Sequence, residues 1–375
     1  MPVPGASNRP AEDVWSAERP DIRGLSLDEL AIATTAAGQP PYRARQAMHW
    51  LHAKHAESFD AMHDLPADYR GWLAAHFTIG SLQTASVARS SDGTRKLLLR
   101  LRGGNAIETV IIPASGRVTL CLSTQAGCAM ACEFCATARM GLHRNLTTAE
   151  IIGQIHAARR ELAPGETLTN YVFMGMGEPL ANYPRLVRAL EIMTEAWGMD
   201  ISPRRITVST VGIVPMMERL LADVPVQLAV SLHATTDEMR DRLAPINKRY
   251  PLEVLLDACR QLPLARRRRI TFEYVMLAGV NDTTADARRL VKLLAPLRAK
   301  VNLIFFNPFD GSGFGVSPRA SIEAFQAILQ AGNLTATIRE SRGQDIAAAC
   351  GQLFAARSED HRENEPRRER TDLAG

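Results

Sequence analysis

The sequence of 375 residues lacks any apolar run near the roughly 18 residues that a membrane-spanning helix needs, so we expect no membrane segment. Its opening residues, MPVPGASNRPAEDVW, lack the basic and apolar stretches of a secretory signal. Six cysteines are too few for a disulfide-stabilised scaffold. These absences predict a cytoplasmic protein whose cysteines serve a chemical purpose.

A large excess of either charge is also missing. The chain has 44 Lys and Arg against 40 Asp and Glu, a formal net charge of +4. An excess this small allows a polyanionic partner but does not require one. The stretch from Thr84 to Gly127 contains six basic and two acidic residues, so the whole formal excess lies there.

Composition and pattern divide the chain into five segments. Residues 1–24 and 356–375 contain few apolar residues and no periodicity, which predicts a disordered leader and a disordered tail. Residues 25–83 have helical periodicity, with Ser26 and Glu29 spaced as a capping box, and predict a small helical accessory domain. Residues 84–113 alternate like strands and predict a short, basic β extension.

From residue 114 to residue 355, strand-like and helix-like segments alternate, which is typical of a parallel α/β sheet or barrel. Six strands fall short of the eight of a closed barrel, so we predict a partial, TIM-like (β/α)6 barrel. A final strand, TATIRES, and a last helix around Cys350 are predicted to pack at its open side. The six predicted strands are 118–124, 170–176, 204–210, 226–232, 270–277 and 301–307.

The cysteines concentrate in GCAMACEFCAT, which directly follows the first strand of the predicted barrel. Cys128, Cys132 and Cys135 have the spacing C-x3-C-x2-C. Three thiolates so close in sequence suit a soft metal or an iron–sulfur cluster. A structural zinc site needs four ligands, and the fourth is missing nearby unless His143 supplies it.

A glycine-containing segment, GMGEP, follows the second strand. Gly175 and Gly177 allow a backbone to approach a ligand closely, and Glu178 can pair with an ammonium group. On its own this pattern also fits a tight turn. Active sites of parallel α/β folds lie at the carboxyl ends of strands, so we expect this loop to face the cysteine loop.

These motifs resemble the radical S-adenosylmethionine (SAM) superfamily, whose loop has the form C-x3-C-aromatic-x-C or a close variant; here the aromatic residue is Phe134, directly before Cys135. Within it, the chain is similar to the RlmN family of RNA methyltransferases, which act on carbon 2 of adenine. The similarity runs from about Pro41 to Phe354. It is carried by SSDGTRKLLLRL, IETVIIP, TLCLSTQAGCAMACEFCATA, GLHRNLT, APINKRY, NPF and RGQDIAAACGQL.

The resemblance implies a radical-SAM barrel in which Cys128, Cys132 and Cys135 hold a [4Fe-4S] cluster. It also implies that Cys350 carries the methyl group and that Cys121 resolves the intermediate. Without the resemblance, both residues fit buried structural thiols. Glu108 matches the proton acceptor of the family, although the alternation alone also fits the solvent face of an edge strand.

The other implied contacts concern SAM, the RNA and the electron source. The implied substrates are adenine 2503 of 23S ribosomal RNA and adenine 37 of some transfer RNAs. The implied electron donor is a protein such as flavodoxin or ferredoxin. SAM is expected to contact Gly177, Glu178, Ser209, Ser231, Leu232, His233 and Asn307.

Two alternatives stay open at this level. The sister family that methylates carbon 8 of the same adenine shares the cluster loop and both accessory cysteines. The IETVIIP and AACGQL contexts resemble the carbon-2 family more closely. A non-catalytic RNA-binding module stabilised by zinc would also use the cysteine loop, and it predicts a colourless protein with no dependence on Cys350.

Overall fold

The computed structural model describes residues 19–80, 82–265 and 268–355. The predicted tail lies outside these residues, as does all but the last part of the predicted leader. Within the described ranges, no helix has both the length and the apolar character that crossing a bilayer would require.

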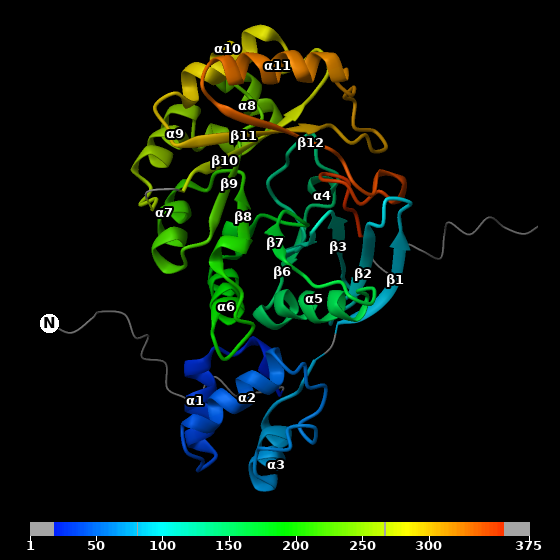
Figure 1. The fold of residues 1–375 in the computed structure, drawn as a ribbon, viewed down its shortest axis with the longest axis vertical. Helices are drawn as coiled ribbons and strands as arrows, with labels where there is room; N and C mark the ends of the chain where they lie inside the picture. Colours follow the sequence, from blue (N-terminus) through cyan, green and yellow to red (C-terminus); the bar gives the residue numbers. More distant parts are fainter. Residues whose placement is uncertain (1–18, 81, 266–267, 356–375) are drawn as a thin grey trace, which may run out of the picture.

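One sheet of ten strands runs through the molecule in the order β1-β2-β3-β4-β7-β8-β9-β10-β11-β12 (Figure 1). From β4 to β12 all neighbours are parallel, whereas β1 to β4 pair antiparallel. The strands are β1 (Gln83–Arg89), β2 (Arg95–Arg100), β3 (Ala106–Ala114), β4 (Arg117–Cys121), β7 (Asn170–Phe173), β8 (Ile206–Thr210), β9 (Gln227–Ser231), β10 (Ile270–Met276), β11 (Ala299–Phe305) and β12 (Thr335–Arg339). A separate hairpin joins β5 (Gln125–Gly127) to β6 (Leu142–Asn145).

The predicted α/β fold with a partial barrel is confirmed. All six predicted strands form, and the predicted final strand TATIRES forms β12, which pairs in parallel with β11. The residues of 84–113 form β1 to β3, which continue the same sheet because β3 pairs with β4. β10 is buried along its whole length, as expected for a central parallel strand, and it is mostly apolar apart from Thr271 and Glu273.

From α5 onward the helices lie between strands of the sheet, and several helices begin at local signals in the sequence. Capping boxes start three of them, with Ser26 and Glu29 at the first, Thr147 with Glu150, and Thr283 with Asp286. The helices are α1 (Leu27–Ala36), α2 (Tyr42–His52), α3 (Ala67–His76), α4 (Ala136–Arg139), α5 (Thr148–Arg160), α6 (Tyr183–Thr194), α7 (Val214–Asp223), α8 (Asp237–Leu243), α9 (Leu252–Gln261), α10 (Thr284–Leu294) and α11 (Arg319–Ala331).

Helices α1 to α3 form a lobe at one end of the molecule, next to α5 and α6 (Figure 1). Three histidine rings meet where this lobe joins α5. His156 of α5 lies 5.8 Å from His52 and 5.2 Å from His55, measured between ring centroids. Both ring nitrogens of His52 are buried and have no hydrogen-bond partner among the described residues.

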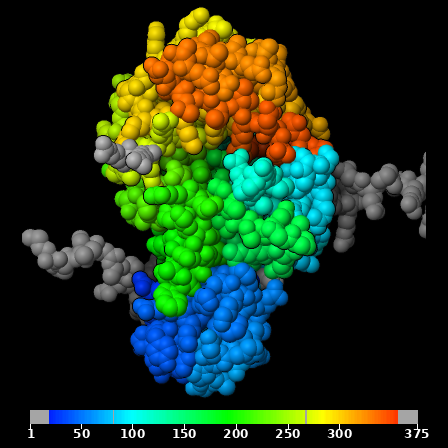
Figure 2. Space-filling model, viewed as in Figure 1, coloured from blue at the N-terminus to red at the C-terminus, as the bar shows by residue number. Residues whose placement is uncertain are grey.

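The predicted helix around Cys350 is wrong. The segment contains only a single 3-10 turn, Gln344–Ile346, and Cys350 lies in a loop that follows it. The backbone enters the left-handed region at Gly343 (φ 64°), Ala347 (φ 49°) and Gly351 (φ 85°), which interrupts any regular helix. Figure 2 shows this segment, in red, between the β extension and α11.

Candidate active site

The cysteine loop, residues 128–135, lies between β5 and α4 and is fixed at both ends by backbone hydrogen bonds. The N–H of Cys128 donates to the carbonyl of Gly141 (2.8 Å), and the N–H of Ala136 donates to the carbonyl of Gly351 (2.7 Å). The second bond joins this loop to the loop of Cys350. All three cysteines are free thiols.

The three thiols form an electrostatically connected group. Burial raises the pKa of Cys128 to about 12, and neighbouring Cys135 and Glu178 contribute to the rise. Burial followed by repulsion from Cys135 and Cys128 raises the pKa of Cys132 well above its usual value. Within the described ranges, no three His, Cys, Asp or Glu side chains converge closely enough to hold one metal ion. Three soft thiol donors that ionise on binding a cation suit an iron–sulfur cluster, whose iron they would ligate.

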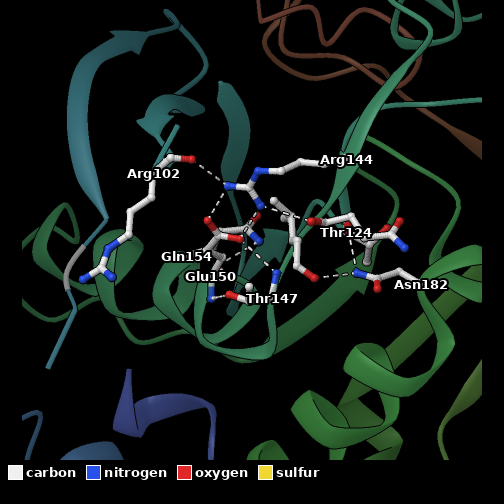
Figure 3. A network of polar contacts seen from close by, with 9 residues as sticks. Arg102, Thr124, Arg144, Thr147, Glu150, Gln154 and Asn182 are labelled. Atoms are coloured by element: carbon white, nitrogen blue, oxygen red, sulfur yellow. Dashed lines mark hydrogen bonds and ion pairs between the residues drawn. The ribbon is translucent and has the colours of Figure 1, made fainter. Parts of the chain in front are cut away.

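A polar network supports the segment that leads into the cysteine loop (Figure 3). Gln154 of α5 donates from Nε2 to the carbonyl of Ser123 (2.8 Å), and Asn182 donates from Nδ2 to the carbonyl of Thr124 (2.9 Å). Arg144 forms an ion pair with Glu150 (2.6 Å) and so ties β6 to the start of α5. These bonds satisfy buried backbone groups and fix the path into Cys128.

The loop after β7 approaches this segment closely. Gly177 has a φ of 97°, and a Cβ there would lie 2.5 Å from the Cβ of Gln125. Glu178 is buried, and its carboxylate accepts from the N–H groups of Leu180 (3.1 Å) and Val211 (2.9 Å). Burial raises its pKa to about 7. A buried carboxylate beside a glycine, whose backbone carries no side chain, suits the ammonium end of SAM.

The residues predicted to line the nucleoside of SAM lie at the ends of β8 and β9. Ser209 and Leu232 are buried, and Ser231 is half-buried. His233 has a left-handed backbone (φ 60°), its Nδ1 accepts from the N–H of Val275 (3.0 Å), and burial lowers its pKa to about 3. Its ring also packs edge-on against Phe134 of the cysteine loop, with centroids 4.4 Å apart. A neutral, strained histidine beside that loop is typical of a functional position.

A cavity of about 620 Å³ occupies the inner face of the sheet and contains three of the predicted site residues: Cys121, Asn307 and Cys350. Cys121 is buried, and burial together with the charge of Cys350 raises its pKa to about 12. Asn307 donates from Nδ2 to the carbonyl of Cys350 (3.1 Å). Gly177, Glu178, Ser209, Ser231, Leu232 and His233 are not among the lining residues.

Glu108 lies on β3 and is buried, so the alternative of a solvent-facing carboxylate is wrong. It does not line the cavity. Its carboxylate contacts Lys96 Nζ (2.8 Å) and accepts from the N–H of Phe354 (2.9 Å) in the loop of Cys350. Burial raises its pKa, and the charge of Lys96 opposes the rise.

Three residues of this region were missed by the sequence analysis. Lys96 lies within the motif SSDGTRKLLLRL, for which the sequence predicts only a basic strand. Arg339 and Glu273 line the cavity from β12 and β10. No local signal marked them, because a charged residue within a strand becomes informative only when its face of the sheet is known.

Basic side chains of residues 84–127 form ion pairs with acidic residues of the same chain. Arg89 pairs with Glu161 (2.9 Å) and Arg95 with Glu166 (2.6 Å), so both fasten the β extension to the end of α5. In the arginine run 266–269, the first two residues lie outside the described residues, and Arg269 donates to Oγ1 of Thr335 (2.8 Å).

Two family models match separate segments of the chain. A family model of the radical SAM superfamily matches residues 122–291, and one described as the ribosomal RNA large subunit methyltransferase N-terminal domain matches residues 20–79.

Similar sequences and structures extend over most of the chain. The dual-specificity RNA methyltransferase RlmN of Geobacter sulfurreducens is 53% identical over 333 residues, which cover 89% of this chain and 91% of that protein. The protein of the same name from Anaeromyxobacter dehalogenans is 50% identical over 92% of this chain and 94% of its own length. A crystal structure of a radical SAM methyltransferase from Sphaerobacter thermophilus is 46% identical, with a TM-score of 0.84, and covers 89% of this chain and 98% of that one.

Proposed function

The chain belongs to the RlmN family of dual-specificity RNA methyltransferases within the radical-SAM superfamily, and from this we propose that it methylates carbon 2 of adenine 2503 in 23S ribosomal RNA and an adenine of some transfer RNAs. One observation carries the proposal. The loop of Cys350 places that thiol in one cavity with Cys121 and is bonded to the end of the cysteine loop and to Glu108.

Cys350 is the proposed methyl acceptor. Carbon 2 of adenine lies between two ring nitrogens and is electron-poor, so it does not attack a sulfonium methyl group directly. A thiolate does so readily, and Cys350 therefore takes the methyl group from one molecule of SAM. When bound at Cys128, Cys132 and Cys135, the cluster supplies, with a second SAM, the radical chemistry that activates this methyl group.

Glu108 is the proposed base that removes the proton from carbon 2. Its carboxylate is held between Lys96 and the N–H of Phe354, four residues after Cys350. Lys96 keeps a share of the carboxylate ionised against the effect of burial. The bond to Phe354, together with the one from Lys96 to the carbonyl of Ala347, also anchors the loop of Cys350, so base and methyl carrier are positioned by one set of bonds.

Cys121 is the proposed resolving residue. It attacks the sulfur of Cys350, which releases the methylated adenine and leaves a disulfide between the two residues. Both line the same cavity. The positive charge of Arg339 favours the thiolate of Cys121 against the strong effect of burial. The disulfide must then be reduced before another turnover.

The partners follow from this chemistry. The adenine must leave its stack to reach Cys350, which favours an RNA loop or a flipped base. The cluster needs an external electron donor, for which flavodoxin and ferredoxin are the candidates, and we propose a cytoplasmic protein in keeping with these partners. The family membership supports carbon 2 over carbon 8 as the site of methylation.

Two measurements test the proposal. Protein purified without oxygen should be brown, contain about four irons per chain, and lose its colour in Cys128→Ala. Cys259→Ala, which removes a buried thiol on α9, is the matched control and should remain brown. Mass spectrometry of nucleosides from treated 23S RNA, with both methyladenosine isomers as standards, should give the carbon-2 product. A colourless protein with one zinc ion would instead support the zinc module, and the carbon-8 isomer would support the sister activity.

A further inference from the structure

Arg240 is a fully buried arginine beside the predicted SAM contacts. It lies on α8 and has an exposed fraction of 0%. Its Nη2 donates to the carbonyls of Val211 (2.7 Å) and Ser231 (3.2 Å), and its Nε donates to the carbonyl of Leu232 (3.2 Å). Val211 directly follows β8, whereas Ser231 and Leu232 lie at the end of β9. One guanidinium therefore joins the loops at the carboxyl ends of two neighbouring strands.

Both loops belong to the predicted SAM site. The N–H of Val211 donates to Oε2 of Glu178 (2.9 Å), the carboxylate predicted to pair with the ammonium group of SAM. Ser231 and Leu232 are predicted to line the nucleoside. A ligand that is bound at both ends needs its two sets of contacts at a fixed separation. Arg240 bonds to the backbone of both sets and is not itself a predicted contact.

The guanidinium is oriented by Asn247, which belongs to the motif APINKRY. Asn247 is buried, and its Oδ1 accepts from Nη1 of Arg240 (3.0 Å). Its Nδ2 donates to Oδ1 of Asp237 (2.9 Å) and to Oδ1 of Asp241 (2.7 Å), both on α8. Because these two acceptors occupy the amide nitrogen, the amide oxygen is the atom that faces the guanidinium. This gives the motif a role in the site.

The same helix also contacts the cysteine loop. At the C-terminal end of α8, the carbonyl of Leu243 accepts from the N–H of Glu133 (3.2 Å), and Arg242 forms an ion pair with the Glu133 carboxylate (3.1 Å). Glu133 lies between Cys132 and Cys135 in the sequence. Helix α8 therefore contacts three segments of the site, namely the cysteine loop and the loops after β8 and β9.

We propose that Arg240 is a positioning residue of the SAM site, which keeps the loops after β8 and β9 at the separation that SAM requires, and that Asn247 orients its guanidinium. The proposal rests on the proposed function, because the SAM contacts of both loops belong to it. One planar guanidinium reaches carbonyls of both loops, whereas a lysine ammonium or a glutamine amide cannot reach all three. Without it, buried carbonyls lose their partners and the loops can shift relative to each other.

The test compares two buried arginines that make similar bonds. Arg23 donates to the carbonyls of Gly80 (2.6 Å) and Ala56 (3.0 Å) in the N-terminal part of the chain, and none of these residues is a predicted SAM contact. Arg23→Gln is therefore the matched control for Arg240→Gln. For the cluster-loaded wild type and each variant, calorimetry gives the Kd for SAM and fluorescence anisotropy gives the affinity for a 23S RNA segment. Methylation kinetics and urea unfolding are measured in parallel.

Both glutamine variants should unfold at lower urea concentrations, because each leaves buried carbonyls without a donor. Only Arg240→Gln should raise the Kd for SAM, by about tenfold or more. The KM for SAM should rise with it, whereas kcat at saturating SAM and the affinity for RNA should stay within about twofold of the wild type. Arg240→Lys should weaken SAM binding nearly as much, because the charge alone does not connect both loops.

Asn247→Ala repeats the test with the guanidinium in place, so the proposal stays testable even if Arg240→Gln fails to fold. This variant should raise the Kd for SAM by about threefold or more, and adding it to Arg240→Lys should cause no further loss, because Asn247 acts through Arg240. Fully additive losses would overturn the orienting role of Asn247.

Wild-type affinity for SAM in Arg240→Gln or Arg240→Lys would overturn the proposal, because Arg240 would then serve only the fold. An equal loss of SAM binding in Arg23→Gln would overturn it as well, because general destabilisation would then account for the effect. Failure of the proposed function gives a different result. In that case the wild type still binds SAM about tenfold or more tightly than Arg240→Gln but methylates no adenine.

Discussion

The backbone N–H of Phe354 donates a hydrogen bond to Oε2 of Glu108 at 2.9 Å, across 246 positions of sequence. The other carboxylate oxygen lies 2.8 Å from Nζ of Lys96, which also donates to the carbonyl of Ala347 (3.2 Å). Glu108 and Lys96 therefore hold the loop of Cys350 on both sides of the thiol. Substitutions in this pair should alter the chemistry of the site more than the fold.

Replacing Lys96 by methionine should move the pH dependence of methylation. The pKa of Glu108 is already raised by burial, and loss of the neighbouring cation raises it further. More of the base is then protonated near neutral pH, so the acidic limb of the rate profile should shift upward by about one pH unit. Lys292→Met, an exposed lysine on α10, serves as control. Identical profiles for Lys96→Met and wild type would exclude the role of Glu108 as the base.

Replacing Cys121 by alanine should trap the RNA on the protein. Without the resolving thiol, the thioether between Cys350 and adenine cannot be broken, so a covalent protein–RNA species should accumulate on denaturing gels. Cys259→Ala removes another buried thiol and should give methylated RNA without an adduct. Release of product at the wild-type rate from Cys121→Ala would contradict the proposed resolution step.

Alanine substitutions at two glycines with left-handed backbones distinguish the effect of backbone strain from that of steric clash. Gly177 (φ 97°) abuts Gln125, whereas a Cβ at Gly116 (φ 70°) would meet nothing within 4 Å. Both alanine variants should lose about 1 kcal/mol of unfolding free energy from the backbone conformation. Only Gly177→Ala should also weaken SAM binding, by about tenfold or more, as measured by calorimetry. Equal SAM affinities in the two variants would remove this loop from the SAM site.

Acid should destabilise the junction between the N-terminal lobe and α5. Burial lowers the pKa of His52 to about 3 and that of His55 to about 4, and also lowers the pKa of His156. The unfolded chain takes up these protons below about pH 6.5, whereas the folded protein resists them until about pH 3, so stability falls as the pH drops through this window. At about pH 5.5 the loss is between about 1 and 2 kcal/mol for His52 alone.

Urea unfolding at two pH values measures this effect. The difference in unfolding free energy between about pH 7.5 and about pH 5.5 should be smaller in His52→Gln than in the wild type. It should stay unchanged in His76→Gln, which removes an exposed histidine of α3. An undiminished pH effect in His52→Gln would show that the acid sensitivity arises elsewhere.

The sequence predicted the barrel well because its strands carry long apolar patterns and its loops contain distinctive motifs. The cysteine loop and the loop with Gly177 lie where the strand order places them. The sequence predicts a helix in the segment of Cys350, DIAAACGQLFAA. Contacts with Asn307, Ala136 and Glu108 determine its path instead, and all three lie far away in the sequence. Local propensity cannot anticipate such tertiary bonds. Glu273 was missed for the same reason, because its place in the cavity is defined only by the surrounding strands.

The bonds that hold the loop of Cys350 also bear on the order in which the protein folds. Lys96 and Ala347 are separated by 251 positions, and contacts of such long sequence separation form late because chain entropy opposes them. The sheet and the cysteine loop can therefore be in place before the last loop closes over them. This order leaves an interval in which iron and sulfide can reach the three thiols, after which closure of the Cys350 loop completes the enzyme.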